Sequence, residues 1–151
     1  MKTTKLNAIK VIGISVRTTN ENGQAAQDIP ALWQKFMSEG TLDKIPNKVN
    51  GTIYSIYTDY ESDHTKPYTT ILGCEVSSLD TISEGMVSTT IEGGNYAIST
   101  AKGNLEHGVV YQEWEKIWNT ELNRKYTTDF EVYGEKAQDM ANAEVDIFVA
   151  L

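Results

Sequence analysis

The chain has 151 residues, of which 40% are hydrophobic and 23% are charged, a composition that is typical of one globular domain and excludes a disordered chain. Thirteen Lys and Arg against 21 Asp and Glu give a net charge of −8. Proteins bind nucleic acids largely through basic residues that displace counterions. This charge therefore argues against direct nucleic-acid contact and favours cationic or neutral ligands.

Two single features narrow the class of protein further. Cys74 is the only cysteine, so neither an intrachain disulfide nor a multi-cysteine metal site can form within this chain. The apolar residues on both sides of Cys74 predict that it is buried. No segment reaches the roughly 20 apolar residues that a membrane-spanning helix needs, so we expect a cytoplasmic protein without membrane contact.

The first half of the chain predicts a strand, a helix and two more strands. Residues 7–17 are β-branched and partly alternating, which is typical of a strand. Asp28 as N-cap and Pro30 in the first turn predict the start of a helix that ends near residue 39 or 40. Its apolar face consists of Ile29, Leu32, Trp33, Phe36 and Met37. Residues 52–58 and 68–76 predict a strand hairpin around a polar loop.

The second half repeats this order. Residues 86–91 and 96–100 occupy the position of the first strand, and the glycine pair between them marks a bulge or tight turn. An apolar stripe then predicts a helix over about 106–122. The stripe consists of Val110, Trp114, Ile117 and Trp118, with Leu122 following. Residues 129–133 and 144–151 predict the two final strands.

Direct similarity between the halves is confined to one short segment. Trp33-Gln34-Lys35-Phe36 resembles Trp114-Glu115-Lys116-Ile117, which lies 81 positions later, and the strands that follow align at an offset near 76. The duplicated β-α-β-β units predict an α+β fold with an antiparallel sheet, two helices packed on it and a central cleft between pseudo-symmetric halves. Residues 1–151 are expected to form this single domain, without a DNA-binding domain.

Glu131 has the most informative setting of any charged residue. Strand alternation places Glu131 and Tyr133 on one face of their strand, and Phe130 and Val132 on the other. If the first face is exposed to solvent, Glu131 is an ordinary surface charge. If the helices bring their tryptophans over it, an apolar cleft contains one carboxylate. Burial would raise the pKa of that carboxylate, and its charge would suit a lipophilic cation.

The aromatic candidates leave two interpretations open. Trp33 and Trp114 lie at the centres of apolar helical stripes, which suits either core packing or the wall of a cleft. Tyr54 and Tyr57 lie on opposite faces of their strand, so at most one of them points into a given cleft.

Neither histidine lies in a catalytic or metal-ligating pattern. His64, in a hydrophilic loop, and His107, at the start of the second helix, are expected at the surface or in capping roles. Asp59, Glu61 and Asp63 alternate but lack the twelve-residue pattern of a calcium loop. The common nucleotide, metalloprotease and serine-hydrolase signatures are missing too, so no cofactor and no metal site is predicted.

Several segments together resemble a known family. Residues 91–97 (IEGGNYA), 130–133 (FEVY) and 144–151 (EVDIFVAL), with the helix at 114–119 (WEKIWN), are similar in order and spacing to the GyrI-like small-molecule-binding domain, also called the bacterial transcription-activator effector-binding domain. The resemblance covers essentially the whole chain. It implies an aromatic cleft between two pseudo-symmetric halves, in which a buried acidic residue receives lipophilic or cationic ligands.

The resemblance also suggests individual site residues. Glu131 takes the acidic ligand-binding position, and Tyr96 and Phe148 match motif positions of the family. Helical and strand periodicity adds two tryptophans and one tyrosine. The expected ligand-binding residues are therefore Glu131, Trp33, Trp114, Tyr57, Tyr96 and Phe148.

The expected function is the binding of an aromatic or cationic small molecule, linked to transcription regulation or to sequestration of a toxic compound. One candidate carboxylate without a partner base or nucleophile favours binding over catalysis. The resemblance implies two alternatives. One is hydrolysis of reactive cyclopropane-type compounds, with Glu131 as general base and a Tyr as polarising donor. The other is contact with a protein partner such as DNA gyrase.

Overall fold

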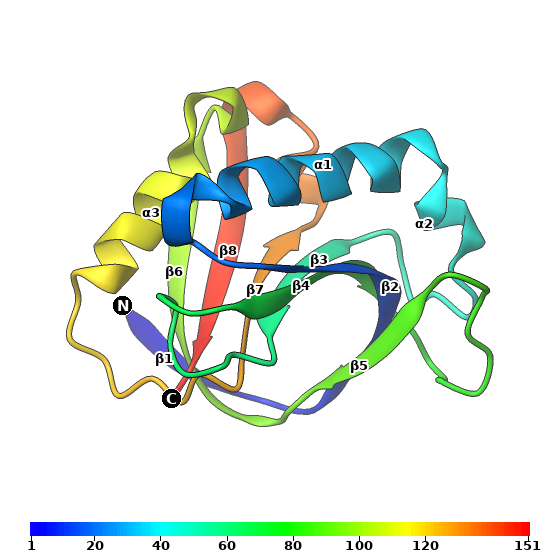
Figure 1. Cartoon of the computed structure of the whole chain (residues 1–151), viewed down its shortest axis with the longest axis horizontal. Helices are drawn as coiled ribbons and strands as arrows, with labels where there is room; N and C mark the ends of the chain where they lie inside the picture. The colour runs from blue at the N-terminus through cyan, green and yellow to red at the C-terminus, as the bar shows by residue number, and fades with distance from the viewer.

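The computed structural model describes residues 1–151 as one eight-stranded antiparallel sheet with the two longer helices on the same face (Figure 1). The strands are β1 (Lys2–Leu6), β2 (Ile9–Thr18), β3 (Ile53–Thr58), β4 (Tyr68–Glu75), β5 (Val87–Ile91), β6 (Gly94–Gly103), β7 (Thr128–Tyr133) and β8 (Ala143–Ala150). The helices are α1 (Ala25–Ser38), α2 (Thr41–Lys44) and α3 (Val109–Trp118). Four 3-10 turns are η1 (Glu21–Gly23), η2 (Leu105–His107), η3 (Glu135–Ala137) and η4 (Met140–Asn142).

The strand order across the sheet is β1-β6-β8-β7-β3-β4-β2-β5, so the two halves meet where β7 pairs with β3. The predicted α+β fold with duplicated β-α-β-β units is confirmed. Each unit also has a leading strand that the sequence did not separate from the next one, and these leading strands are exchanged between the halves. β1 pairs with β6 of the second half, and β5 pairs with β2 of the first.

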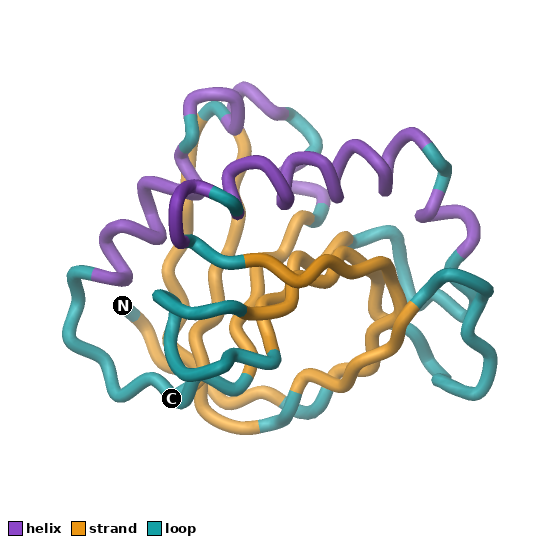
Figure 2. The backbone as a smooth tube through the Cα atoms, viewed as in Figure 1, coloured by secondary structure: helices purple, strands orange, loops and turns teal.

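The sheet curls because its connections are short. β1 and β2 lie six strand positions apart, which is about 29 Å in a flat sheet at about 4.8 Å per strand. Only two residues join them, and three peptide steps span at most about 11 Å. The two edges of the sheet must therefore come close together, and Figure 2 shows the strands curling beneath the long helices. The matching passage from β5 to β6 ends at Gly94, whose φ of 152° is a conformation that favours glycine.

Both long helices differ at their ends from the sequence-based expectation. α1 begins at Ala25 with Gln24 in the cap position, so Asp28 is not the N-cap and Pro30 lies in the second turn. The Asp28 carboxylate instead accepts hydrogen bonds from Thr18 Oγ1 (2.9 Å) and Gln24 Nε2 (3.0 Å). α3 spans ten residues rather than seventeen, because Gly108, at a φ of 71°, separates it from η2, and it ends at Trp118.

Apolar residues pack on both faces of the sheet. On the outer face, α1 covers β2 and β4 through a cluster that contains Phe36 and Cys74, and α3 covers β6 and β8 through a cluster that contains Ile117. The predicted burial of Cys74 is confirmed, and burial raises the pKa of its thiol to about 11. On the inner face, the cluster around Ile56 and Phe130 draws side chains from all eight strands, which a curled sheet allows.

The outer face is organised differently at its centre. A cross-strand row runs from Leu72 on β4 through Ser55 on β3 and Glu131 on β7 to Ile147 on β8. Leu72 belongs to the core beneath α1, and Ile147 belongs to the core beneath α3. The two polar residues of the row therefore lie between the two helix-covered cores.

Candidate ligand-binding site

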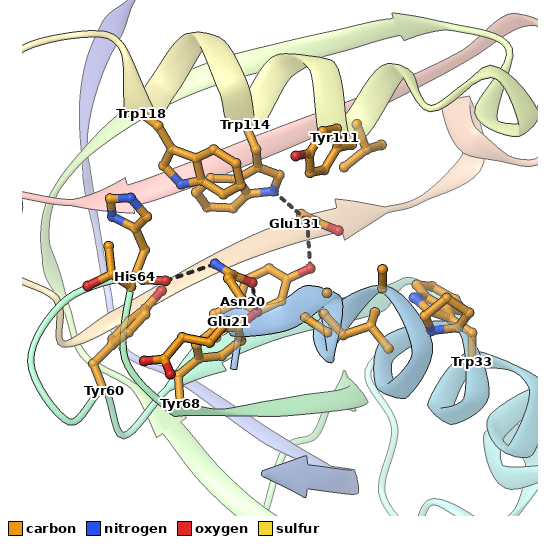
Figure 3. Close-up of a pocket in the computed structure, with 18 of the residues that line it drawn as sticks. Asn20, Glu21, Trp33, Tyr60, His64, Tyr68, Tyr111, Trp114, Trp118 and Glu131 are labelled. Carbon is orange, nitrogen blue, oxygen red and sulfur yellow. Dashed lines mark hydrogen bonds between the residues drawn. The ribbon is translucent and has the colours of Figure 1, made fainter. Parts of the chain in front are cut away.

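A cavity of about 710 Å³ lies on the outer face, between α1 and α3 and over the central strands β3 and β7. Trp33 of α1 and Trp114 and Trp118 of α3 line its walls, and Glu131 lies at its floor (Figure 3). Tyr57 lines the cavity as well. The predicted central cleft between the halves is present. It exists because α1 and α3 each cover their own half of the sheet and leave the junction between the halves open.

Glu131 is 2% exposed, and three neutral donors bind its carboxylate. Tyr133 donates its hydroxyl to Oε1 (2.6 Å), while Tyr57 Oη and Trp114 Nε1 donate to Oε2 (2.7 Å each). None of the ion pairs of the protein includes Glu131. The cavity floor therefore holds a carboxylate whose hydrogen bonds are satisfied but whose charge has no counter-ion.

Burial and hydrogen bonding act on the Glu131 carboxyl in opposite directions. Burial raises its pKa, and the hydrogen bonds from Tyr133, Trp114 and Tyr57 lower it, with burial the larger effect. The same burial, together with the negative charge nearby, holds the pKa values of the Tyr57 and Tyr133 hydroxyls well above 10. These tyrosines therefore stay neutral and remain donors at physiological pH.

The polar floor lies at the junction of the two repeats. Tyr133 follows Tyr57 by 76 positions, and the same offset relates Ser55 to Glu131. Ser55 and Glu131 are also direct partners in the pairing of β3 with β7. The two tyrosines are therefore equivalent donors that reach Glu131 from the two halves, whereas the carboxylate itself occurs in the second half only.

The two helix tryptophans repeat this relationship with one difference. Trp33 packs edge-on against Tyr133 at 4.9 Å between ring centroids, and Trp114 packs edge-on against Tyr57 at 5.6 Å. Each tryptophan thus contacts the tyrosine of the opposite half. Only Trp114 also donates to Glu131. The frame of rings is symmetric, and its hydrogen bonding to the carboxylate is not.

A second end of the cavity is formed by residues that sequence reasoning missed. The loop from 59 to 67 folds over the end of α3, so that His64 stacks on Trp118 with 5.3 Å between ring centroids. Asn20 holds the loop there, because its Nδ2 donates to the His64 carbonyl (2.8 Å) and its Oδ1 accepts from Tyr68 Oη (2.6 Å). His64 therefore lines the cavity, contrary to the expected surface or capping role. Tyr60 lines it as well.

Asp129 lies beneath this end, two residues before Glu131 on the same strand face, and is fully buried. Arg124 pairs with its Oδ2 at 2.8 Å, Tyr60 Oη donates to the same oxygen at 2.6 Å, and the Ala150 amide donates to Oδ1 at 2.9 Å. Unlike Glu131, this carboxylate has a buried counter-ion. The spacing of two acidic residues in 129–133 was the only sequence signal for it.

Tyr96 and Phe148 do not line this cavity, which corrects their expected placement. Glu131 pairs with Ile147, so strand alternation directs the adjacent Phe148 to the inner face. There Phe148 stacks on Phe130 at 4.7 Å, and Tyr96 packs against both rings while its hydroxyl donates to the Glu92 carbonyl (2.6 Å). The structure thus brings together Glu131, Trp33, Trp114 and Tyr57 and leaves the other two in the core.

Known proteins share this sequence pattern and fold. A family model described as integron-associated effector binding protein, Cass2, matches residues 2–151. The chain belongs to this family. The Cass2 integron cassette protein of Vibrio cholerae is 33% identical, and its structure superposes with a TM-score of 0.76 over 99% of this chain and 94% of that chain. The GyrI-like effector-binding fold implied by the sequence is confirmed.

Two further proteins are similar to this chain over nearly its whole length. The structure of SAV2435 bound to tetraphenylphosphonium is 19% identical and has a TM-score of 0.78 over 98% of this chain and 91% of that chain. The candidate transcriptional regulator protein YobU of Bacillus subtilis is 26% identical over 98% of this chain and 95% of its own length.

Membership of the Cass2 family makes this chain an effector-binding protein. No helix of the structure has the length and apolar character to cross a membrane. No group of three or more His, Cys, Asp and Glu side chains is placed to hold a metal ion.

Proposed function

We propose that this protein binds a lipophilic aromatic cation in the cavity between α1 and α3, with Glu131 as the charge complement. The observation that carries the proposal is the Glu131 carboxylate, which is buried at the floor of an aromatic cavity, held by three neutral donors and free of any counter-ion. An ionised carboxylate in such a place costs several kcal/mol of lost hydration, about the scale of the attraction that a bound cation would supply.

The walls favour the same class of ligand. Trp114 and Trp118 lie with their rings 6.3 Å apart on α3, and Trp33 faces them from α1. A cation over an aromatic face gains about 0.5 to 2 kcal/mol from each well-placed ring, and the rings also remove the apolar part of the ligand from water. The tetraphenylphosphonium-bound structure of SAV2435 supports this choice of ligand class.

The hydrogen bonding of Glu131 favours binding over hydrolysis. A general base needs a free lone pair directed at a water molecule, and the three donors take three of the roughly four lone-pair sites of the carboxylate. The same donors hold the carboxylate in one orientation, which suits a fixed charge that attracts a ligand. Hydrolysis of cyclopropane-type compounds at Glu131 is therefore the second candidate and an outcome of the test.

Titration with two ions of one shape tests the proposal. Tetraphenylphosphonium and tetraphenylborate differ in the sign of their charge, and tryptophan fluorescence or calorimetry reports binding of either. We expect the wild type to bind the phosphonium and to exclude the borate. Glu131→Gln is expected to weaken phosphonium binding at least about thirtyfold, since removing one partner of a buried charge pair costs about 2 to 5 kcal/mol.

Glu113→Gln is the matched control. Glu113 also lies on the helix-bearing face, on α3, where Ser99 donates to it, but it does not line the cavity. Equal phosphonium affinity in Glu131→Gln and the wild type would contradict the charge role. Products of a cyclopropane-bearing electrophile that appear with the wild type and not with Glu131→Gln would favour the hydrolase.

The proposal includes a regulatory role for ligand binding. The likeness to YobU, a candidate transcriptional regulator, supports a role in which occupancy of the cavity changes contact with a partner protein. Capture of partners from lysate with and without tetraphenylphosphonium tests this role. A partner retained in one condition only supports regulation, and identical capture in both favours sequestration of the ligand.

A further inference from the structure

Arg124 closes the end of the cavity next to Asp129. Its side chain is only 5% exposed, it lines the cavity, and its guanidinium lies over the Tyr126 ring with Cζ 4.3 Å from the centroid. One terminal nitrogen, Nη2, donates to Asp129 at 2.8 Å. The ion pair and the aromatic ring therefore hold the guanidinium in one place, as a preformed binding group requires.

The Nε–H group of Arg124 is buried and has no hydrogen-bond partner within the protein. Only two other buried side-chain polar atoms share this property, His64 Nδ1 and Thr70 Oγ1. Arg124 and His64 both line the cavity, and both pack on Tyr126. A buried donor without an acceptor costs about 1 to 3 kcal/mol, so a ligand acceptor that comes within hydrogen-bond distance of Arg124 Nε recovers that free energy.

The charge balance at this end selects the kind of acceptor. The Arg124 charge is compensated by Asp129. Burial and the nearby guanidinium lower the pKa of His64, so its imidazole is neutral near pH 7. The end as a whole is close to neutral and offers a donor without an excess of positive charge. An uncharged oxygen fits it better than an anion, which would also meet the Asp129 carboxylate.

The spacing along β7 relates this donor to the charge site. Asp129 and Glu131 lie on the same strand face two residues apart, which corresponds to about 7 Å. Arg124 is bonded to the first carboxylate, and the cation proposed above is bound at the second. A ligand that fills both ends therefore carries two polar groups joined by an apolar scaffold.

This inference rests on the proposed function. We propose that Arg124 Nε, beside His64, forms a second subsite of the cavity that binds an uncharged acceptor oxygen of the ligand, such as a ketone or amide carbonyl. The preferred ligands are then aromatic cations that also carry a carbonyl oxygen. Glu131 selects for the charge, and Arg124 selects among lipophilic cations.

Two matched phosphonium probes test the subsite. In (4-oxopentyl)triphenylphosphonium a C=O group takes the place of the CH(CH3) branch of (4-methylpentyl)triphenylphosphonium, so the two share charge, aromatic groups and chain length. The readout is the ratio of their dissociation constants, which cancels effects common to both probes. We expect this ratio to shift by about three- to tenfold against the ketone in Arg124→Lys, which keeps a cation for Asp129 but removes the Nε–H group.

The chain offers a matched control and a second readout. Arg17 is the only other arginine, is exposed and does not line the cavity, so Arg17→Lys should leave the ratio at its wild-type value. With two arginines, the protein has two Nε–H signals in its nitrogen-15 NMR spectrum, and Arg17→Lys assigns them. The ketone probe should shift the Arg124 signal of the wild type more than the hydrocarbon probe does, which tests the subsite even if Arg124→Lys fails to fold.

The possible results separate the two proposals. Binding of both probes with an unchanged ratio in Arg124→Lys, or with equal shifts of the Arg124 signal in the wild type, overturns the acceptor subsite and leaves the cation site standing. Failure of both probes to bind the wild type overturns the cation site and the subsite together. A ratio that changes equally in Arg17→Lys also overturns the subsite, because the effect would then not come from Arg124 in the cavity.

Discussion

Two carboxylates near the cavity, Glu131 on its floor and Asp129 beneath the Arg124 end, are nearly identical by burial and hydrogen-bond count. Asp129 and Glu131 lie on the same face of β7, neither is more than 2% exposed, and each accepts three hydrogen bonds. They differ in the charge of the donors, because Arg124 is one of the three at Asp129 and all three at Glu131 are neutral. Hydrogen-bond satisfaction therefore does not distinguish the two carboxylates, whereas the presence of a counter-ion does.

The largest expected effect on stability comes from removing the Asp129 carboxylate, which forms the ion pair with Arg124. Asp129→Asn keeps the size of the side chain and leaves the Arg124 guanidinium buried without a counter-ion. We expect a loss of about 3 to 5 kcal/mol in the free energy of unfolding, measured by urea denaturation. Glu131→Gln is the variant for comparison, because it removes a charge that has no ion-pair partner. A loss of similar size in both variants would contradict the assigned difference between the two ends.

The next largest effect is expected on the pH dependence of ligand binding, in which Trp114 and its counterpart Trp33 should differ. Trp114→Phe keeps an aromatic wall but removes the N–H donor to Glu131, whereas Trp33→Phe removes no such bond. A hydrogen bond to a charged group contributes about 1.5 to 3 kcal/mol, so its loss in Trp114→Phe should raise the pKa of Glu131 further. Phosphonium affinity weakens as the pH falls through this pKa, because the protonated carboxyl has no charge to offer. The pH midpoint of binding should therefore rise in Trp114→Phe and stay at its wild-type value in Trp33→Phe.

A smaller effect concerns the stability of the protein without ligand. The pKa of Glu131 is raised on folding, so between its unfolded and folded values the folded protein holds the proton more strongly, and stability falls as the pH rises. Above the folded value the full penalty is present, and Glu131→Gln removes it. We expect this variant to melt about 2 to 4 °C above the wild type at pH 8 and to lose the advantage below about pH 4. A melting temperature below that of the wild type at pH 8 would show that the hydrogen bonds to the carboxylate outweigh its burial.

Much of the arrangement around Glu131 depends on local sequence patterns and could be predicted from the sequence. Strand alternation alone places Glu131 with Tyr133 and away from Phe130, because side chains two residues apart share a face. Helical periodicity places Trp33 and Trp114 on the sheet-facing sides of their helices. The repeat offset of 76 relates Tyr57 to Tyr133, and the structure adds that both hydroxyls reach one carboxylate.

The remainder depends on contacts between segments that are distant in the sequence. The path of the loop from 59 to 67 brings His64 onto Trp118, and no local pattern near His64 specifies that contact. Arg124 lies in an irregular segment, so its pairing with Asp129 has no periodic signal. The exchange of β1 and β5 between the halves is set by the curl of the whole sheet, which the glycine pair at 93–94 permits but does not determine.

The smallest expected effect on binding concerns the inner face of the sheet. Tyr96→Phe removes a buried hydroxyl that donates to the Glu92 carbonyl, so the protein should lose about 1 kcal/mol of stability. Phosphonium affinity should stay within about twofold of the wild type, because the sheet itself separates the Tyr96 ring from the cavity. Tyr57→Phe is the contrasting variant, since it removes one hydroxyl from the outer face and with it a donor to Glu131. If Tyr96→Phe weakened binding as much as Tyr57→Phe, the two faces would be coupled through the sheet and the cavity would not be an independent site.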